Sequence, residues 1–238
     1  MEIKDIEFFE SPISKKRLLL ACLHYFVGYS YVYPMILLSI TQIFTHRDTL
    51  SVGWAIALTV FVLVTTVMLL WPVYKESWEN FKKDLFKNIG YIIIYMVALF
   101  VINVVLSLII MLITGLDSSA NQLAIEEMFV KYPFYITFSA VVFAPIVEEG
   151  IFRGGFFRWF SSRNMVKAYV ISSVLFGFLH VYDSVFAGNF LDVAFVVVYA
   201  GMGTVFAHLY QKTDQMISGI ILHALYNGLS ILMLVMML

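Results

Sequence analysis

Residues 90–116 read GYIIIYMVALFVINVVLSLIIMLITGL, a stretch without a single charged side chain. A helix needs about 20 mostly apolar residues to cross the hydrocarbon core of a bilayer. Because lipid offers the backbone no hydrogen-bond partners, a segment of this kind must satisfy its own polar groups and is expected to be helical. The stretch therefore predicts a membrane-spanning helix.

Six further apolar segments accompany this one. They are residues 18–44, 50–74, 133–157, 166–182, 191–210 and 215–238. The whole chain is 61% hydrophobic and 13% charged, whereas soluble domains are about 45–50% apolar and about 25% charged. We expect an all-α, polytopic transmembrane bundle of about seven spans, formed by residues 1–238 as a single membrane domain. The short fifth segment is expected to be tilted or incomplete.

Basic residues are unevenly divided between the predicted loops. With the N-terminus in the cytoplasm, only Arg47 and Lys131 of the 15 Lys and Arg residues face outside, and Arg153 lies within a span. Positive charge collects on the cytoplasmic side of membrane proteins. The pattern predicts a multi-pass cell-membrane protein with a cytoplasmic N-terminus. On that side, residues 78–86 mix aromatic and basic side chains, which is compatible with a short surface helix or with a basic loop.

The composition also narrows the classes of partner. A net charge of -1 gives no indication of a nucleic-acid partner. The single cysteine, Cys22, excludes both a disulfide framework and a cysteine-based zinc site within one chain. We expect membrane lipid, a membrane-associated peptide or protein substrate and, as a further possibility, another membrane protein as partners.

Ionisable residues within spans are rare and usually functional. They are few here, and three short stretches stand out, APIVEEGIFR at 144–153, FGFLH at 176–180 and HALYN at 223–227. His24 and His208 also lie in predicted spans but belong to no such stretch, and we interpret them as interfacial or packing residues. Counted from the nearest inner basic residue at about 1.5 Å per residue, Glu148, His180 and His223 lie about 15, 20 and 16 Å deep. Three side chains from three spans at similar depth predict a shared, water-containing cavity.

The two adjacent glutamates are expected to have different roles. Glu149 and Arg153 are four residues apart, so they share a helix face and can form an ion pair. Glu148 is five residues from Arg153 and points away from that face, which leaves its carboxylate available as a general base. Pro145 loosens the helix just before them and makes room for water.

The two histidine stretches suggest supporting groups. His223 and Asn227 share one face of the last span, and two donors on one face make a plausible oxyanion hole. His180 comes from a different helix and is placed to help Glu148 hold a water molecule.

These three stretches together resemble the CPBP family, which comprises the CAAX proteases and bacteriocin-processing enzymes and is also called the Abi family. The family motifs are EExxxR, FxxxH and HxxxN, found here at 148–153, 176–180 and 223–227 in the same order. The resemblance covers roughly residues 133–230, which we take as the catalytic core. The first three spans match only in hydrophobicity.

The resemblance implies a helical fold that encloses a cavity open toward the cytosol. It implies an endopeptidase that uses a glutamate-activated water and no metal or other cofactor, with a membrane-associated pheromone, bacteriocin or CAAX-like substrate. The implied catalytic residues are Glu148, His180, His223 and Asn227, supported structurally by Glu149 and Arg153.

Three other interpretations compete with a glutamate peptidase. The same fold could serve as a non-catalytic membrane regulator or a bacteriocin self-immunity protein. A transporter could relay protons through Glu148 and the histidines, although no inverted repeat supports this. One glutamate and two histidines could also bind zinc, but the H-E-x-x-H motif is missing from the sequence.

Overall fold

The computed structural model describes residues 13–46 and 48–237, and within these ranges it contains helices and no strand. Lys4 and Arg47, which contribute to the predicted orientation, lie outside the described residues. In chain order, the elements are α1 (Lys15–Cys22), η1 (Leu23–Val32), α2 (Tyr33–Thr45), α3 (Val52–Lys83), α4 (Leu85–Thr114), α5 (Ala120–Lys131), α6 (Pro133–Phe138), η2 (Ser139–Phe143), α7 (Ala144–Glu149), η3 (Gly150–Phe157), α8 (Arg158–Ser161), α9 (Met165–Leu179), α10 (Tyr182–Phe186), α11 (Phe190–Val193), α12 (Val196–Thr213) and α13 (Ile217–Met237).

The described part of the chain has six helices that are long and apolar enough to cross a membrane. They are Lys15–Thr45, Val52–Lys83, Leu85–Thr114, Pro133–Ser161, Phe190–Thr213 and Ile217–Met237. The fifth predicted segment, 166–182, corresponds to α9, which has 15 residues and at 1.5 Å per residue is only about 22 Å long. A polytopic helical bundle is therefore confirmed, with α9 too short to cross a core of about 30 Å unaided.

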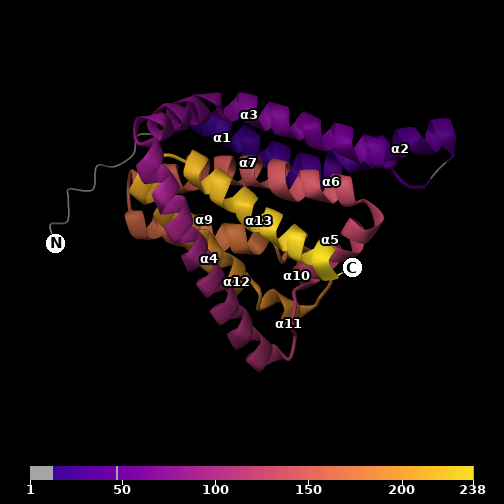
Figure 1. The fold of residues 1–238 in the computed structure, drawn as a ribbon. Coiled ribbons are helices and arrows are strands. Elements are labelled where there is room, and N and C mark those ends of the chain that lie inside the picture. The colour runs from indigo at the N-terminus through magenta and orange to yellow at the C-terminus, as the bar shows by residue number, and fades with distance from the viewer. Residues whose placement is uncertain (1–12, 47, 238) are drawn as a thin grey trace.

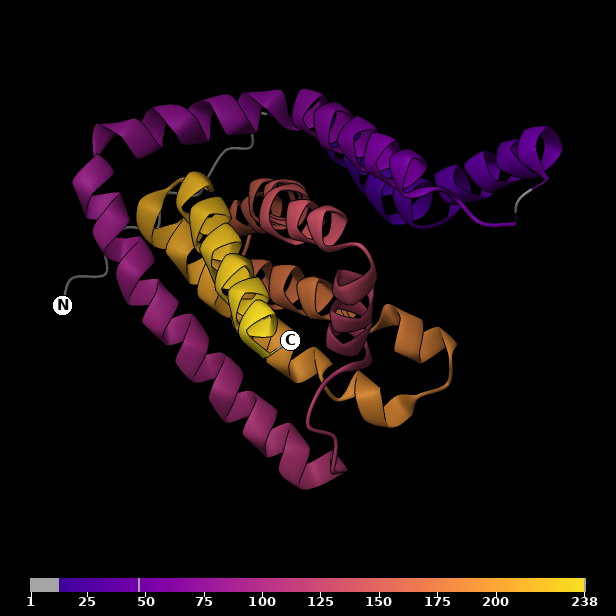
Figure 2. The same cartoon turned by 45° about the vertical axis from the view of Figure 1, so that its right-hand side comes forward.

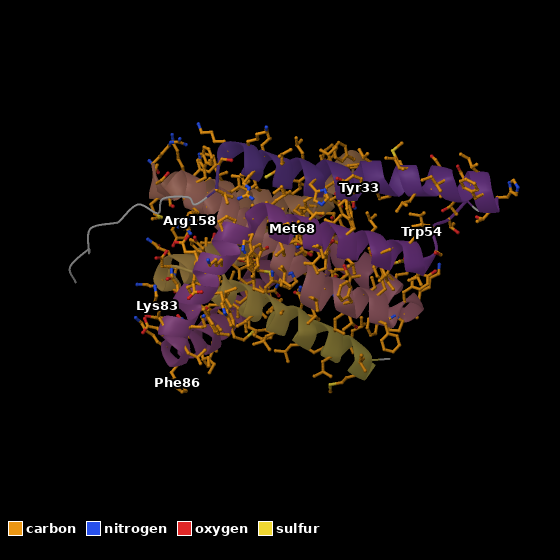
Figure 3. All side chains as sticks on the ribbon, turned by 90° about the horizontal axis from the view of Figure 1, so that it is seen from above. Tyr33, Trp54, Met68, Lys83, Phe86 and Arg158 are labelled. Carbon is orange, nitrogen blue, oxygen red and sulfur yellow. The ribbon has the colours of Figure 1, made fainter. Side chains whose placement is uncertain are left out.

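The outer faces of these helices are apolar. On α4, for example, Ile93, Val101 and Leu112 are all exposed. Figure 3 shows side chains covering the outside of the helices. Exposing so much apolar surface to water is unfavourable, so these faces are suited to contact with lipid.

The segment 78–86 is neither a separate surface helix nor a loop. Residues up to Lys83 continue α3, and the helix ends at Asp84, whose backbone is non-helical with φ -126° and ψ 46°. Pro72 lies inside α3, where it removes one hydrogen-bond donor and favours a bend. Figure 2 shows α3 changing direction along its length before α4 turns away from it. The aromatic and basic residues of 78–83 thus form the last turns of a long helix.

The segment 117–131, which was predicted to be an outer loop, also contains a helix. Ser119 is the N-cap of α5, and its Oγ accepts a hydrogen bond from the backbone N–H of Gln122. This is the usual way in which serine caps a helix start.

Close helix packing holds the second half of the chain together. Helix α12 packs against α9 and α4, while α13 packs against α4 and α7, and Figure 1 shows α13 running beside α7. A Cβ atom on Gly177 of α9 would lie 2.6 Å from the carbonyl oxygen of Val196. Small residues allow such close approach between membrane helices. The end of α9, where His180 follows, is therefore fixed against α12.

Candidate active site

Glu149 and Arg153 form the expected ion pair in a fully buried environment. Arg153 Nη1 lies 3.0 Å from Glu149 Oε1, and Nη2 donates to the carbonyl oxygen of Gly203 at 2.9 Å. The guanidinium also lies over the rings of Phe176 and Phe206, at 4.6 and 5.0 Å from their centroids. Such contacts offset the cost of burying a cation. The arrangement joins η3 to α9 and α12.

Glu148 is buried in a different environment. Its exposed fraction is 5%, and its Oε1 accepts a hydrogen bond from the hydroxyl of Tyr25 at 3.2 Å. Among the residues that the structure describes, its Oε2 has no hydrogen-bond partner. Glu149 Oε2 also has no hydrogen-bond partner among those residues. The neighbouring glutamates differ as the helix spacing predicts, because Arg153 pairs with Glu149 and not with Glu148.

His180 follows the last residue of α9 and is held on two sides. Its Nδ1 lies 2.9 Å from the carbonyl oxygen of Phe176. Because a carbonyl can only accept, Nδ1 carries the hydrogen, and in the neutral ring Nε2 is then the acceptor. The ring stacks on Tyr199, with centroids 4.4 Å apart and planes 19° apart. Glu148 and His223 are electrostatic neighbours of the imidazole.

A polar network anchors the stacking partner of His180. The hydroxyl groups of Tyr199 and Ser119 lie 2.7 Å apart, and Asn121 donates to the same phenol at 3.4 Å. Next to them, the buried carboxylate of Asp192 accepts the backbone N–H of Ala120 at 2.7 Å. These bonds connect the start of α5 to α11 and α12, and so fix the ring on which His180 rests.

His223 contacts Glu149. Its Nδ1 lies 3.4 Å from Glu149 Oε1, which is long for a hydrogen bond. Its ring packs against Phe206, with centroids 5.0 Å apart. One turn earlier in α13, a Cβ atom on Gly219 would come within 3.1 Å of Glu149 Oε2. Gly219 therefore allows α13, and His223 with it, to approach the glutamate pair closely.

Asn227 has a structural partner that the sequence did not predict. Its Nδ2 donates to the carbonyl oxygen of Ala140 at 2.7 Å. Ala140 lies in the π-helical segment η2, where the backbone N–H of Ala144 bonds to Ser139. The next donor in the π register would be residue 145, which is a proline and has no N–H. Asn227 thus satisfies a carbonyl that the helix leaves unpaired, and its second amide hydrogen remains available.

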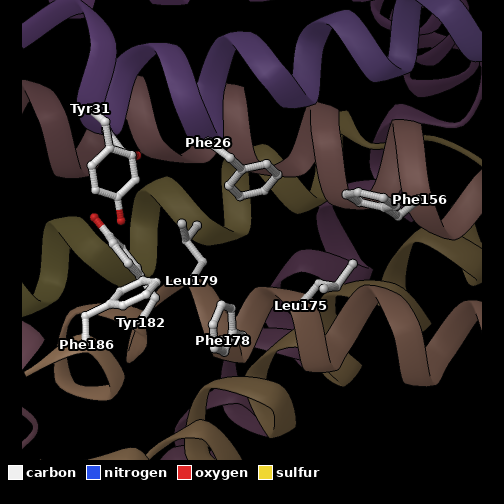
Figure 4. Close-up of a pocket in the computed structure, with 9 residues that line it drawn as sticks. Phe26, Tyr31, Phe156, Leu175, Phe178, Leu179, Tyr182 and Phe186 are labelled. Carbon is white, nitrogen blue, oxygen red and sulfur yellow. The ribbon is translucent and has the colours of Figure 1, made fainter. Parts of the chain in front are cut away.

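An apolar groove of about 390 Å³ lies beside these residues. Phe26 and Leu179 line it, and they directly neighbour Tyr25 and His180 in the chain. Figure 4 shows Phe26 facing Leu179 and Phe178 across the groove, with the hydroxyls of Tyr31 and Tyr182 turned toward each other. The lining residues are Phe26, Ser30, Tyr31, Phe156, Leu175, Phe178, Leu179, Tyr182 and Phe186.

Comparison with known proteins identifies the family. Residues 130–229 match the family described as type II CAAX prenyl endopeptidase Rce1-like. "Putative membrane peptidase YdiL" of Bacillus subtilis is 30% identical over 186 residues, covering 76% of this chain and 70% of the relative. The chain belongs to the CPBP family. It is thereby a member of a family of membrane proteases.

Two other relatives extend the comparison of this CPBP-family protein. "Membrane-embedded CAAX protease MroQ" of Staphylococcus aureus is 24% identical over 185 residues, covering 73% of this chain and 70% of the relative. "UPF0177 protein YaiF" of Lactococcus lactis is 25% identical over 176 residues, covering 71% of this chain and 74% of the relative. No solved structure matches the chain.

Sequence reasoning missed two residues of the site in this CPBP-family protein. Tyr25 lies outside the segment that matches the family, and Tyr199 lies inside it but in none of the three motifs. A weak signal was present for Tyr25, because the span containing it reads YFVGYSYVY at 25–33. Several hydroxyl-bearing rings in one apolar span indicate polar partners within the bundle. No comparable signal marked Tyr199.

Within the described ranges, no group of three or more His, Cys, Asp and Glu side chains is arranged to hold a metal ion. Metal independence stays a prediction, which activity measurements can test.

Proposed function

We propose that this protein is an intramembrane endopeptidase in which Glu148 and His180 activate a water molecule. The observation that carries the proposal is the contrast between two adjacent buried glutamates. Each glutamate keeps one carboxylate oxygen without a hydrogen-bond partner among the described residues. Arg153 neutralises Glu149, whereas Glu148 has no ion-pair partner among those residues and has His180 as an electrostatic neighbour. An ionisable group left available inside a membrane protein is usually functional.

The proposed reaction begins with transfer of one proton from water to Glu148 Oε2. The other hydrogen stays on the water oxygen and is donated as a hydrogen bond to Nε2 of His180. The water oxygen bonds to the peptide carbonyl carbon, and the carbonyl π electrons move onto its oxygen. When this oxyanion collapses, the C–N bond breaks and protonated Glu148 gives its proton to the leaving amine. Atoms and charge balance without a metal.

Asn227 and His223 are proposed to stabilise the oxyanion. Asn227 uses the amide hydrogen that does not bond to Ala140. Nδ1 of His223 lies 3.4 Å from Glu149 Oε1 without a hydrogen bond, and in the neutral tautomer that carries its hydrogen on Nε2 the ring can donate from Nε2 to the oxyanion. Donors held in place before the reaction contribute more than donors that must reorganise.

The groove next to the site supports a substrate that carries a bulky apolar group. Its lining is aromatic and aliphatic apart from Ser30 and the hydroxyls of Tyr31 and Tyr182. A membrane-associated pheromone, bacteriocin or CAAX-like peptide has this character. The proposal also includes access to the cavity from the cytosol and residence in the cell membrane.

Mass spectrometry of released peptides and of membrane-protein termini tests the proposed function. Cells that carry the wild type are expected to contain cleavage products missing from cells with equal amounts of Glu148→Gln protein. Identical product sets would contradict the peptidase proposal. If the variant also kept the full cellular phenotype, a non-catalytic regulator or immunity protein would be the better explanation.

The proposed orientation places the N-terminus and the α3–α4 junction in the cytoplasm. Figure 3 shows Lys83 and Arg158 near one end of the molecule and Trp54 near the other, so these two basic residues share one end of the bundle. In a Cys22→Ser background, a cysteine replacing Lys82 should react with an impermeant maleimide only after the cells are permeabilised. A cysteine replacing exposed Lys131 should react in intact cells. The reverse labelling pattern would overturn this orientation.

A further inference from the structure

Two tyrosines in consecutive turns of η1 have different polar partners. Tyr25 donates to Glu148 Oε1 at 3.2 Å, while the hydroxyl of Tyr29 lies 3.4 Å from Oγ1 of Thr59. Their rings stack nearly parallel, with centroids 6.0 Å apart and planes 9° apart. The two side chains thus share one helix and one packing environment, and of the two only Tyr25 is hydrogen-bonded to Glu148.

The phenol of Tyr25 is well placed to fix the orientation of the carboxylate. An ionised carboxylate has no hydrogen to give, so Tyr25 is the donor. Its exposed fraction is 6%, and its ring is packed against Tyr29, Phe26 and Phe143. A ring held by its neighbours keeps its hydroxyl in one position. Rotation of the Glu148 carboxyl group would break this hydrogen bond.

The bond distinguishes the two oxygens of Glu148. Oε1 is occupied by the phenol, and Oε2 has no partner among the described residues. Hydrogen bonds to an ionised group inside a protein are stronger than bonds between neutral groups. A general base must also present one lone pair to the water within about 2.6–3.2 Å.

We propose that Tyr25 is a positioning residue that holds Glu148 Oε1, so that Oε2 is the atom that accepts the proton from water. This inference rests on the proposed peptidase function. The first span lies outside the segment matched to the family at 130–229. The inference gives this span a part in organising the active site.

The test compares two substitutions that each remove a single hydroxyl. The assay uses the full-length protein in detergent and a synthetic peptide substrate. The peptide spans a cleavage site that mass spectrometry detects in wild-type cells and not in Glu148→Gln cells. Tyr25→Phe is expected to lower kcat about 10- to 100-fold, the equivalent of a hydrogen bond to a charged group, with KM and Tm near those of the wild type. Tyr29→Phe is the matched control and is expected to keep kcat within about two-fold.

A third variant separates positioning from packing. Tyr25→Leu removes both the ring and the hydroxyl, so its kcat per folded molecule should be at least as low as that of Tyr25→Phe. If Tyr25→Phe instead matches Tyr29→Phe and only Tyr25→Leu loses activity, the ring acts by packing and the inference is overturned.

Measuring Glu148→Gln in the same assay distinguishes a failure of the role of Tyr25 from a failure of the proposed peptidase function. An inactive Glu148→Gln protein alongside a fully active Tyr25→Phe protein would overturn only the role of Tyr25. An active Glu148→Gln protein, or the lack of any wild-type-dependent product, would overturn the proposed function itself.

Discussion

Replacing Glu148 by glutamine is expected to lower kcat by about 100- to 10,000-fold, the range that general acid–base catalysis contributes. The amide keeps the size and polarity of the side chain, and its oxygen can still accept the hydrogen bond from Tyr25. It cannot take a proton from water. KM should change little, because the substrate contacts that we assign to the groove are untouched.

Folding of the Glu148→Gln protein should be close to that of the wild type. The substitution leaves the Glu149–Arg153 pair intact, and the structure gives Glu148 no ion-pair partner of its own among the described residues. Membrane abundance and Tm in detergent are the measurements. A well-folded variant with kcat within ten-fold of the wild type would show that Glu148 is not the base.

The adjacent substitution, Glu149→Gln, is expected to act mainly on stability. It leaves the Arg153 cation in a fully buried position without its carboxylate. Removing one partner of a buried pair typically costs about 3–5 kcal/mol. The free energy of unfolding in detergent should fall by this amount, and activity should fall with the loss of folded protein and of the contact to His223.

An exposed pair in α3 provides the matched control for Glu149→Gln. Glu79 and Lys82 lie 3.5 Å apart, with side chains about half exposed. Glu79→Gln should therefore cost about 0–1 kcal/mol. Adding Arg153→Met to Glu149→Gln should recover part of the lost stability, because the double variant has no unpaired buried charge. Equal costs for Glu149→Gln and Glu79→Gln would contradict the structural role of the buried pair.

The local part of the site could be predicted from the sequence. The ion pair between Glu149 and Arg153 follows from a spacing of four residues on one helix, and the separation of Glu148 follows from a spacing of five. The all-helical membrane fold follows from long apolar segments, since lipid leaves few alternatives. In both cases the information lies within one helix or in bulk composition.

The rest depends on contacts between distant segments. Tyr25 is 123 residues from Glu148 in the chain, and no spacing rule joins them. Asn227 was predicted from its position relative to His223, but its bond to Ala140 requires the π-helical geometry of η2. Residues 78–83 were predicted to form a surface helix or a loop, but they are the end of α3. Mixed aromatic and basic side chains are typical of any segment at a membrane interface, so this pattern cannot separate a loop, a surface helix and the end of a span.

The central claim is that a glutamate, and no metal ion, activates the water. The most direct measurement is the rate at which the purified protein cleaves its identified peptide after exhaustive treatment with a high-affinity zinc chelator. We expect the rate to remain at the untreated level and Glu148→Gln to stay inactive when zinc is added. Loss of activity on chelation, with recovery only on addition of zinc, would contradict the account.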